Sequence, residues 1–156
     1  MPRDKVLIVG VGNELLGDEG LGVHVARTLL TRTEPLPSHL EVLEAGTALL
    51  DLLPSISHYS RVILVDAVRA GRECGSVCSV DLSSALDGSP KFSLPASLHQ
   101  WGLMDTLRTG RILGLLPGSI SLIGAEPEII APGVGLSPKL AMAAERIISL
   151  LLADLP

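Results

Sequence analysis

The start of the chain constrains the fold more than any other segment. A continuous run of β-branched residues and leucine over residues 5–9 stops at Gly10-Val-Gly12-Asn13, and apolar residues at helical spacing follow over 20–31. Such a run is expected of a central parallel strand that is buried on both faces. Two adjacent carboxylates, Asp18 and Glu19, lie in the connection. The sequence therefore predicts acidic side chains at the carboxyl end of a strand, where open α/β sheets bind their ligands.

The rest of the chain alternates between strand-like and helix-like segments. We expect strands over 5–9, 40–43, 61–66, 75–82 and 119–125, and helices over 20–31, 47–53, 100–109 and from 138 onward. Pro54 is expected to end the second helix and Gly110 the third, whereas Ser137-Pro138 is typical of a helix start. The alternation predicts an α/β fold, a three-layer α/β/α sandwich around a mostly parallel sheet with right-handed crossovers. No linker or repeat interrupts it, so we expect residues 1–156 to form a single domain.

Composition narrows the classes of function. Hydrophobic residues make up 47% of the chain and aromatic residues only 2%, which predicts an aliphatic core, and the formal net charge is −5. Because the sequence has no basic run, we expect no nucleic acid and no membrane surface as partner. No apolar stretch approaches the roughly 20 residues that span a bilayer, and no signal peptide is evident. We therefore expect a cytoplasmic protein, a monomer, with Cys74 and Cys78 reduced.

The glycine-rich loop resembles a nucleotide-binding loop only superficially. The dinucleotide fingerprint needs a third glycine where this chain has Leu15, and the Gly-Lys-Ser/Thr sequence of a Walker A loop is missing. The carboxylates of Asp18 and Glu19 would also repel a pyrophosphate. The sequence thus disfavours a nucleotide cofactor.

Each candidate site residue also has a simple structural explanation. Asp18 or Glu19 alone is an acid in the first turn of a helix, where it complements the helix dipole. Asp66 directly follows a buried strand and is equally explained as a helix N-cap, and a histidine such as His99, in a loop before a helix, is usually structural. Since adjacent side chains point in different directions, one of Asp18 and Glu19 can cap the helix while the other faces the strand ends.

Together, Glu19, Asp66 and His99 form a set of two carboxylates and an imidazole from three separate loops. Loops that follow adjacent strands of a doubly wound sheet meet at its switch point, so the three side chains are expected to converge. Such a set binds a divalent cation that polarises a carbonyl or activates water, or its free carboxylates act as a general base. These donors do not select nickel over zinc. Ser93 and Ser97 lie near His99 but outside any G-x-S-x-G elbow, which disfavours a serine hydrolase.

The order and spacing of five motifs resemble the nickel–iron hydrogenase maturation endopeptidases over essentially the whole chain. The motifs are Gly10-Val-Gly12-Asn13 with Gly17-Asp18-Glu19-Gly20-Leu-Gly-Val, then Glu44-Ala-Gly46-Thr47, Ile63-Leu-Val-Asp66-Ala67, Leu98-His99-Gln100-Trp-Gly-Leu and Leu122-Ile-Gly124-Ala-Glu-Pro127-Glu. The resemblance implies an α/β/α sandwich with a five-stranded sheet, in agreement with the alternation of segments.

The resemblance also implies an activity. It indicates a peptidase, often grouped with the aspartic proteases, that removes a short C-terminal extension from a hydrogenase large-subunit precursor after nickel has been inserted. The metal-binding residues of the family fall on Glu19, Asp66 and His99 of this chain, which leaves Asp18 to serve the loop. In that family the metal is the nickel that the substrate supplies, and the resemblance implies that it serves as the recognition element here. Glu19 or Asp66 would assist the attacking water.

One motif departs from the family pattern. Many members have Asp-Gly-Gly-Thr where this chain has Glu44-Ala-Gly46-Thr47. If this loop contacts the substrate, the preferred large subunit or its C-terminal peptide differs. The alternative function that we consider is a non-catalytic module that senses metal or docks a partner during hydrogenase assembly.

Overall fold

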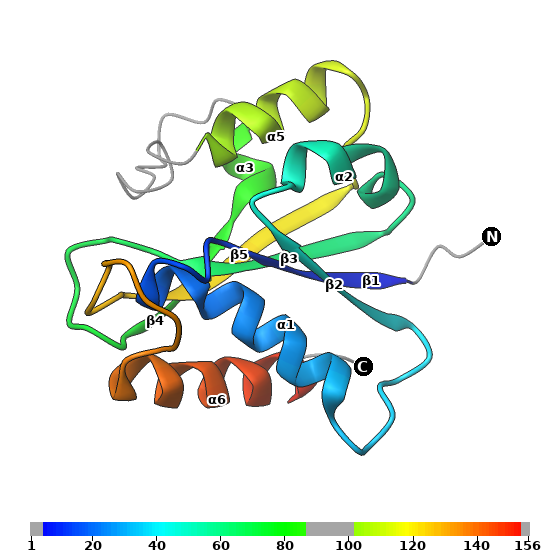
Figure 1. Ribbon diagram of the computed structural model, residues 1–156. Coiled ribbons are helices and arrows are strands. Elements are labelled where there is room, and N and C mark those ends of the chain that lie inside the picture. The colour runs from blue at the N-terminus through cyan, green and yellow to red at the C-terminus, as the bar shows by residue number, and fades with distance from the viewer. Residues whose placement is uncertain (1–4, 87–101, 154–156) are drawn as a thin grey trace.

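The computed structural model describes residues 5–86 and 102–153, which form three layers (Figure 1). The central sheet has the strand order β2-β1-β3-β5-β4. Its strands are β1 (Val6–Val11), β2 (Leu40–Gly46), β3 (Arg61–Ala67), β4 (Val77–Asp81) and β5 (Ser119–Ala125). All neighbouring pairs are parallel except β4 and β5, which are antiparallel. The predicted five-stranded, mostly parallel sheet is confirmed.

Helices cover both faces of the sheet (Figure 1). One face carries α1 (Leu21–Thr31) and α6 (Pro138–Ala153), and the other carries α2 (Leu49–Ile56), α3 (Leu82–Leu86) and α5 (Leu103–Ile112). The two-residue repeat of the strands sends Ile8 and Ile63 into the core beneath α1 and α6, and Val9 and Leu64 into the opposite core. The buried members of both cores are aliphatic apart from Met104, as the composition predicted.

Helix α1 lies directly against the backbone of the two central strands at Gly22. A Cβ atom on Gly22 would lie 2.0 Å from the carbonyl oxygen of Val65 and 2.2 Å from that of Val11. A Cβ atom on Gly10 would likewise lie 2.2 Å from the carbonyl oxygen of Gly22. Only glycine allows this approach, which fixes the first turn of α1 over the carboxyl ends of β1 and β3.

Two predicted helix ends were wrong. Helix α2 continues past Pro54 to Ile56. The proline removes one N–H donor near the end of the helix, and burial of Leu53 and Ile56 holds the last turn. Helix α5 continues past Gly110 to Ile112. Gly110 is a close-packing position, because a Cβ atom there would lie 3.0 Å from a methyl carbon of Leu53 on α2.

The final helix begins as predicted. Its first residue is Pro138, and the Ser137 hydroxyl accepts a 3.4 Å hydrogen bond from the Leu140 amide.

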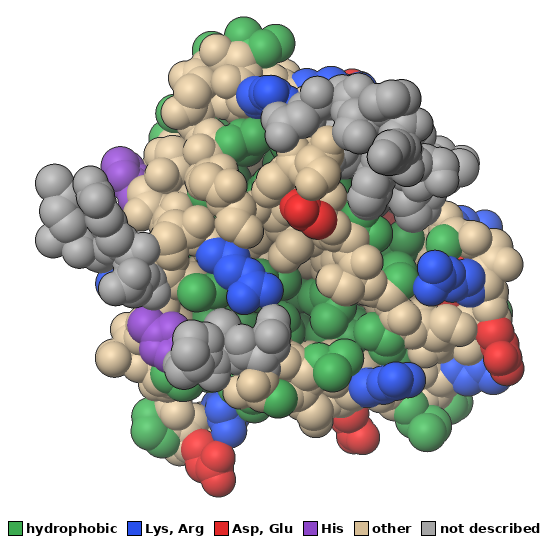
Figure 2. Space-filling view, turned by 180° about the vertical axis from the view of Figure 1, so that it is seen from behind, with side chains coloured by type: hydrophobic (Ala, Val, Ile, Leu, Met, Phe, Trp, Pro, Cys, Tyr) green, Lys and Arg blue, Asp and Glu red, His purple; other side chains and the backbone are tan. Residues whose placement is uncertain are grey.

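No helix in the described part of the chain is long and apolar enough to cross a membrane. On the face seen in Figure 2, Lys and Arg side chains are scattered and do not gather into a basic patch. Cys74 and Cys78 are both free thiols.

The contact at Gly22 leads to the first prediction. Gly22→Ala should lower the free energy of unfolding by about 3 kcal/mol or more, because the added methyl group collides with two backbone carbonyls. Gly118→Ala is the matched control, since a Cβ atom there meets nothing within 4 Å. Its free energy of unfolding should change by no more than about 0.5 kcal/mol in the same urea titration. Equal stability of the two variants would contradict the close contact.

Candidate active site

Asp66 is the last residue but one of β3 and is only 8% exposed. By the two-residue repeat it shares a face of the strand with Leu64, and it extends beyond the core at the carboxyl edge of the sheet. Its Oδ1 accepts a 2.8 Å hydrogen bond from the Ala67 amide. Burial raises the pKa of Asp66 well above its usual range; the Ala67 amide opposes this effect and the charge of Glu19 adds to it. Ionisation of the Asp66 carboxyl is therefore harder than that of an exposed aspartate.

Glu19 approaches from the loop that follows β1. It lies in the 3₁₀ turn η1 (Gly17–Gly20) and is 5% exposed. Its Oε2 is buried and accepts no hydrogen bond from any described residue. Burial raises the pKa of the Glu19 carboxyl, and the positive charge of Arg69 opposes this effect. A buried carboxylate oxygen without a donor is unusual and indicates a site that binds a cation or a proton.

Glu19 and Asp66 line the same cavity of about 480 Å³. Its other walls come from the segments after β1, β2, β3 and β5 and from two helices: Val11, Gly12, Asn13, Leu16, Gly46, Thr47, Leu49, Leu50, Ala67, Arg69, Leu103, Thr106, Pro127 and Ile130. In the sheet, β2 lies on one side of β1 and β3 lies on the other, so the direction in which strands are added reverses at β1. The cavity therefore lies at the topological switch point of the sheet. Two acids thus lie in a largely apolar hollow.

The glycine at position 12 makes room for this pair. Its φ of +129° is one that residues with a side chain rarely adopt. A Cβ atom there would lie 2.1 Å from the carbonyl oxygen of Glu19 and 3.0 Å from Oδ1 of Asp66. The loop glycine therefore serves the approach of two acidic residues rather than the binding of a phosphate.

Asp18 has a different environment from its neighbour. It is completely buried, and its carboxylate accepts hydrogen bonds of 2.9, 2.8 and 2.7 Å from the amides of Glu128, Ile129 and Ser137. The Ser137 hydroxyl donates a fourth, at 2.9 Å. Burial by itself would raise the pKa of Asp18, but these donors together hold it below the ordinary value. Asp18 therefore serves a loop, as the sequence predicted, and remains ionised.

The predicted ligand set is only partly within the described residues. Glu19 and Asp66 come together in the cavity, whereas His99 lies outside the described residues, and so do Ser93 and Ser97. Within 5–86 and 102–153, no three His, Cys, Asp or Glu side chains form a cluster that could hold a metal ion. The role of His99 as third ligand stays a prediction.

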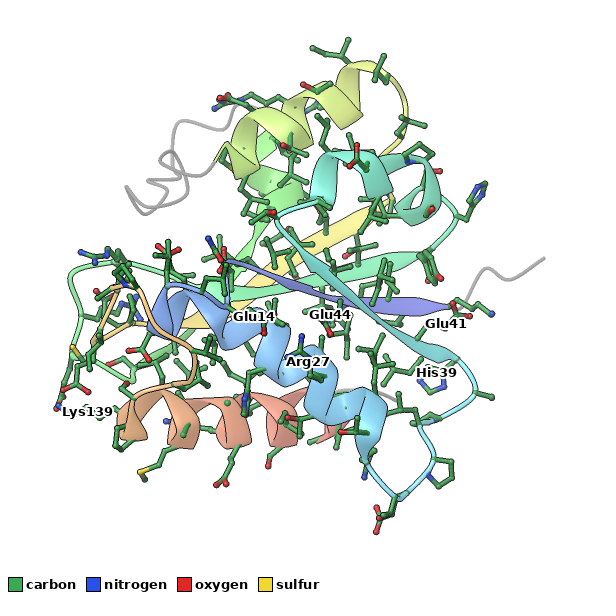
Figure 3. The ribbon with its side chains drawn as sticks, in the orientation of Figure 1. Glu14, Arg27, His39, Glu41, Glu44 and Lys139 are labelled. Atoms are coloured by element: carbon green, nitrogen blue, oxygen red, sulfur yellow. The ribbon has the colours of Figure 1, made fainter. Side chains whose placement is uncertain are left out.

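The motif that departs from the family pattern lies at the end of β2 and has two parts with different surroundings. Gly46 and Thr47 line the cavity. The Glu44 carboxylate is instead paired with Arg27 of α1, at 2.6 and 3.2 Å. Arg27 also donates a 2.9 Å hydrogen bond to Glu14, and the three side chains point toward one another (Figure 3). The longer acid at position 44 thus links β2 to α1.

Sequence reasoning missed several residues of the cavity. Arg69 follows Asp66 by three positions, lines the cavity, and carries a positive charge that opposes the rise in the pKa of Glu19. Leu103 and Thr106 of α5 line the cavity as well. The position of Arg69 in the loop after β3 is a signal that could have identified it. Leu103 and Thr106 carry no such signal, because only the packing of α5 brings them to the cavity.

Comparison with known proteins gives consistent matches. The sequence model of the family HycI, described as hydrogenase maturation protease, matches residues 23–154. The Hydrogenase 2 maturation protease of Escherichia coli strain K12 is 32% identical over 151 residues, which cover 97% of this chain and 90% of that protein. The hydrogenase expression/formation protein HupD of Rhodobacter capsulatus is 35% identical over 141 residues, covering 88% of this chain and 65% of that protein.

A solved structure agrees with these sequence matches. The hydrogenase maturating endopeptidase HybD from Escherichia coli superposes with a TM-score of 0.79 at 32% identity. The superposition covers 97% of this chain and 91% of that one. The similarity therefore extends over nearly the whole fold.

The environment of Asp18 predicts an acid-dependent loss of stability. Asp18→Asn should lower the free energy of unfolding by about 2 kcal/mol at pH 7, because it weakens charge-assisted hydrogen bonds. The folded-state pKa lies below the unfolded value of about 3.9, so this stabilisation is present above that value and is lost as the pH falls through the folded pKa. Urea titrations should show a smaller difference between the two proteins at pH 3 than at pH 7. An equal difference at both would contradict the assignment.

The environment of Asp66 predicts the opposite dependence of stability on pH. Its folded-state pKa is raised, so ionisation destabilises the folded protein, and stability falls as the pH rises from the unfolded pKa through the folded one. Asp66→Asn should therefore raise the free energy of unfolding at pH 8 by about 1 kcal/mol, as removal of site strain commonly does. The gain should vanish near pH 4.

The matched control for Asp66→Asn is Asp105→Asn. The Asp105 side chain is 81% exposed and forms a surface ion pair with Arg108. Its replacement should change stability by less than about 0.5 kcal/mol at either pH. A loss of stability in Asp66→Asn at pH 8 would show that the Asp66 carboxylate stabilises the fold.

Proposed function

We propose that this chain, which belongs to the hydrogenase maturation protease family and is a peptidase, removes a C-terminal extension from a nickel–iron hydrogenase large-subunit precursor after nickel insertion. The nickel of the precursor is part of the substrate. It serves as the recognition element, so that only a precursor with its metal in place is cleaved.

The observation that carries this proposal is the pairing of Glu19 and Asp66 in one cavity. Both carboxyls are buried, and Glu19 Oε2 has no hydrogen-bond donor among the described residues. Such a pair is costly in an otherwise apolar hollow unless a cation or a proton offsets the charge. Carboxylate oxygens together with an imidazole suit a borderline divalent cation, so Glu19, Asp66 and His99 would bind the substrate nickel.

One of the two carboxyls also assists the attacking water. A general base works best when its pKa lies near the operating pH, and burial raises the pKa of both Glu19 and Asp66 in that direction. A carboxylate in this position takes a proton from water as the oxygen attacks the peptide carbonyl. This role would place the enzyme with the aspartic-type peptidases.

The remaining cavity walls suit a peptide substrate. Leu49, Leu103 and Ile130 offer apolar surface beside the acids, and Thr47 and Thr106 offer hydroxyl groups. A cavity of about 480 Å³ holds a few side chains of an extended segment but not a folded domain. The substrate segment that enters is therefore the region around the scissile bond.

The test is cleavage of purified large-subunit precursor in nickel-loaded and nickel-free forms. We expect mass spectrometry to show loss of the extension only from the loaded precursor. Glu19→Gln, Asp66→Asn and His99→Ala should each lower the cleavage rate by at least about 100-fold. Glu145→Gln, at an exposed position on α6, is the matched control and should cleave at the rate of the unchanged protein.

Two results would contradict this mechanism: equal cleavage of both precursor forms, and cleavage of neither form. A gel-shift assay with Asp66→Asn adds an independent measurement. If this variant still binds loaded precursor but leaves its extension in place, Asp66 acts in the reaction and not only in docking.

A further inference from the structure

Two segments far apart in the sequence are joined beside the cavity. The Asp18 amide donates a 2.9 Å hydrogen bond to the Ile129 carbonyl, and the Gly17 amide a 2.8 Å bond to the Gly133 carbonyl. The Gly133 amide in turn donates a 2.9 Å bond to the Leu15 carbonyl. Backbone hydrogen bonds thus join the turn that carries Glu19, and Leu15 before it, to the segment over 127–137.

That segment has little regular structure of its own. Between β5 and α6 the structure assigns it only an isolated bridge, between Leu16 and Gly133. The Asp18 carboxylate draws three of its amides and one hydroxyl to a single buried point. Because no helix or sheet ladder defines the path of 127–137, this carboxylate is a main determinant of it.

The same segment forms a wall of the cavity. Pro127 and Ile130 line the hollow that holds Glu19 and Asp66. Asp18 itself is 0% exposed and has its carboxylate occupied by the four donors, so it does not reach a substrate.

We propose that Asp18 is a positioning residue for substrate binding: it holds 127–137 as the wall against which the precursor segment binds. The inference rests on the proposed function for its substrate. Asp66 is fixed separately within β3, between β1 and β5. The start of α1, next to Glu19, is fixed by the contact of Gly22 with the strands. Loss of the Asp18 carboxylate should therefore weaken binding far more than it slows the chemical step.

The test is the kinetics of Asp18→Asn on nickel-loaded precursor, below the temperature at which the variant unfolds. We expect KM to rise about tenfold or more while kcat stays within about twofold, the pattern of lost binding interactions. Ser137→Ala removes one of the four donors and should raise KM to a smaller extent. Glu145→Gln should leave both constants unchanged. Simple destabilisation would instead lower kcat through loss of active protein and leave KM unchanged.

Hydrogen exchange measured by mass spectrometry gives a readout that does not need the substrate. Amides of 127–137 should exchange at least about tenfold faster in Asp18→Asn, while those of β1 and β3 keep their protection. An unchanged KM, or unchanged exchange over 127–137, overturns the proposal. If Asp18→Asn does not fold, Ser137→Ala decides by the same two measurements.

Failure of the proposed function is distinguishable from failure of this inference. If the unchanged protein cleaves no precursor, the proposed function fails, and the exchange experiment still tests whether Asp18 holds the segment. If the unchanged protein cleaves normally and Asp18→Asn does so with the same KM, only the positioning role is lost.

Discussion

The contact between Gly22 and the backbones of β1 and β3 is the constraint on which the site depends. It leaves no space for a side chain between the helix and the strand ends. The turn that precedes the helix must therefore lie over the carboxyl edge of the sheet, and Glu19 is brought to the end of the strand that carries Asp66.

The two adjacent acids of this turn have opposite electrostatic environments. Asp18 meets four donors and its pKa falls, whereas Oε2 of Glu19 meets none among residues 5–86 and 102–153, and the pKa of Glu19 rises. The Asp18 carboxylate thus stabilises the fold, whereas the charged form of Glu19 is disfavoured by its burial. This division is common in enzymes, where stability is given up at the residues that act on the substrate.

The sequence predicted the sheet and the placement of two acids because both follow from local patterns. Apolar runs mark β1 and β3, and the residue that ends such a run must lie at the carboxyl edge. It could not predict that Gly110 sits inside α5, since that depends on contact with Leu53 of a helix more than fifty residues earlier. The same holds for the donors of Asp18 and for the α5 residues of the cavity, which only the folded arrangement brings into place.

The hydrogen bonds of Asp18 also bear on how the protein is made. They join residues 110 to 119 positions apart, from the first loop of the chain to the start of its last helix. Contacts of such separation form slowly, because the entropy lost in closing a long loop must be overcome before they stabilise the fold. During synthesis, β1, β3 and both site acids leave the ribosome well before the segment that completes the cavity wall. An unfinished chain therefore lacks a complete site, and a peptidase of this design gains its cleft only when its C-terminal third is in place.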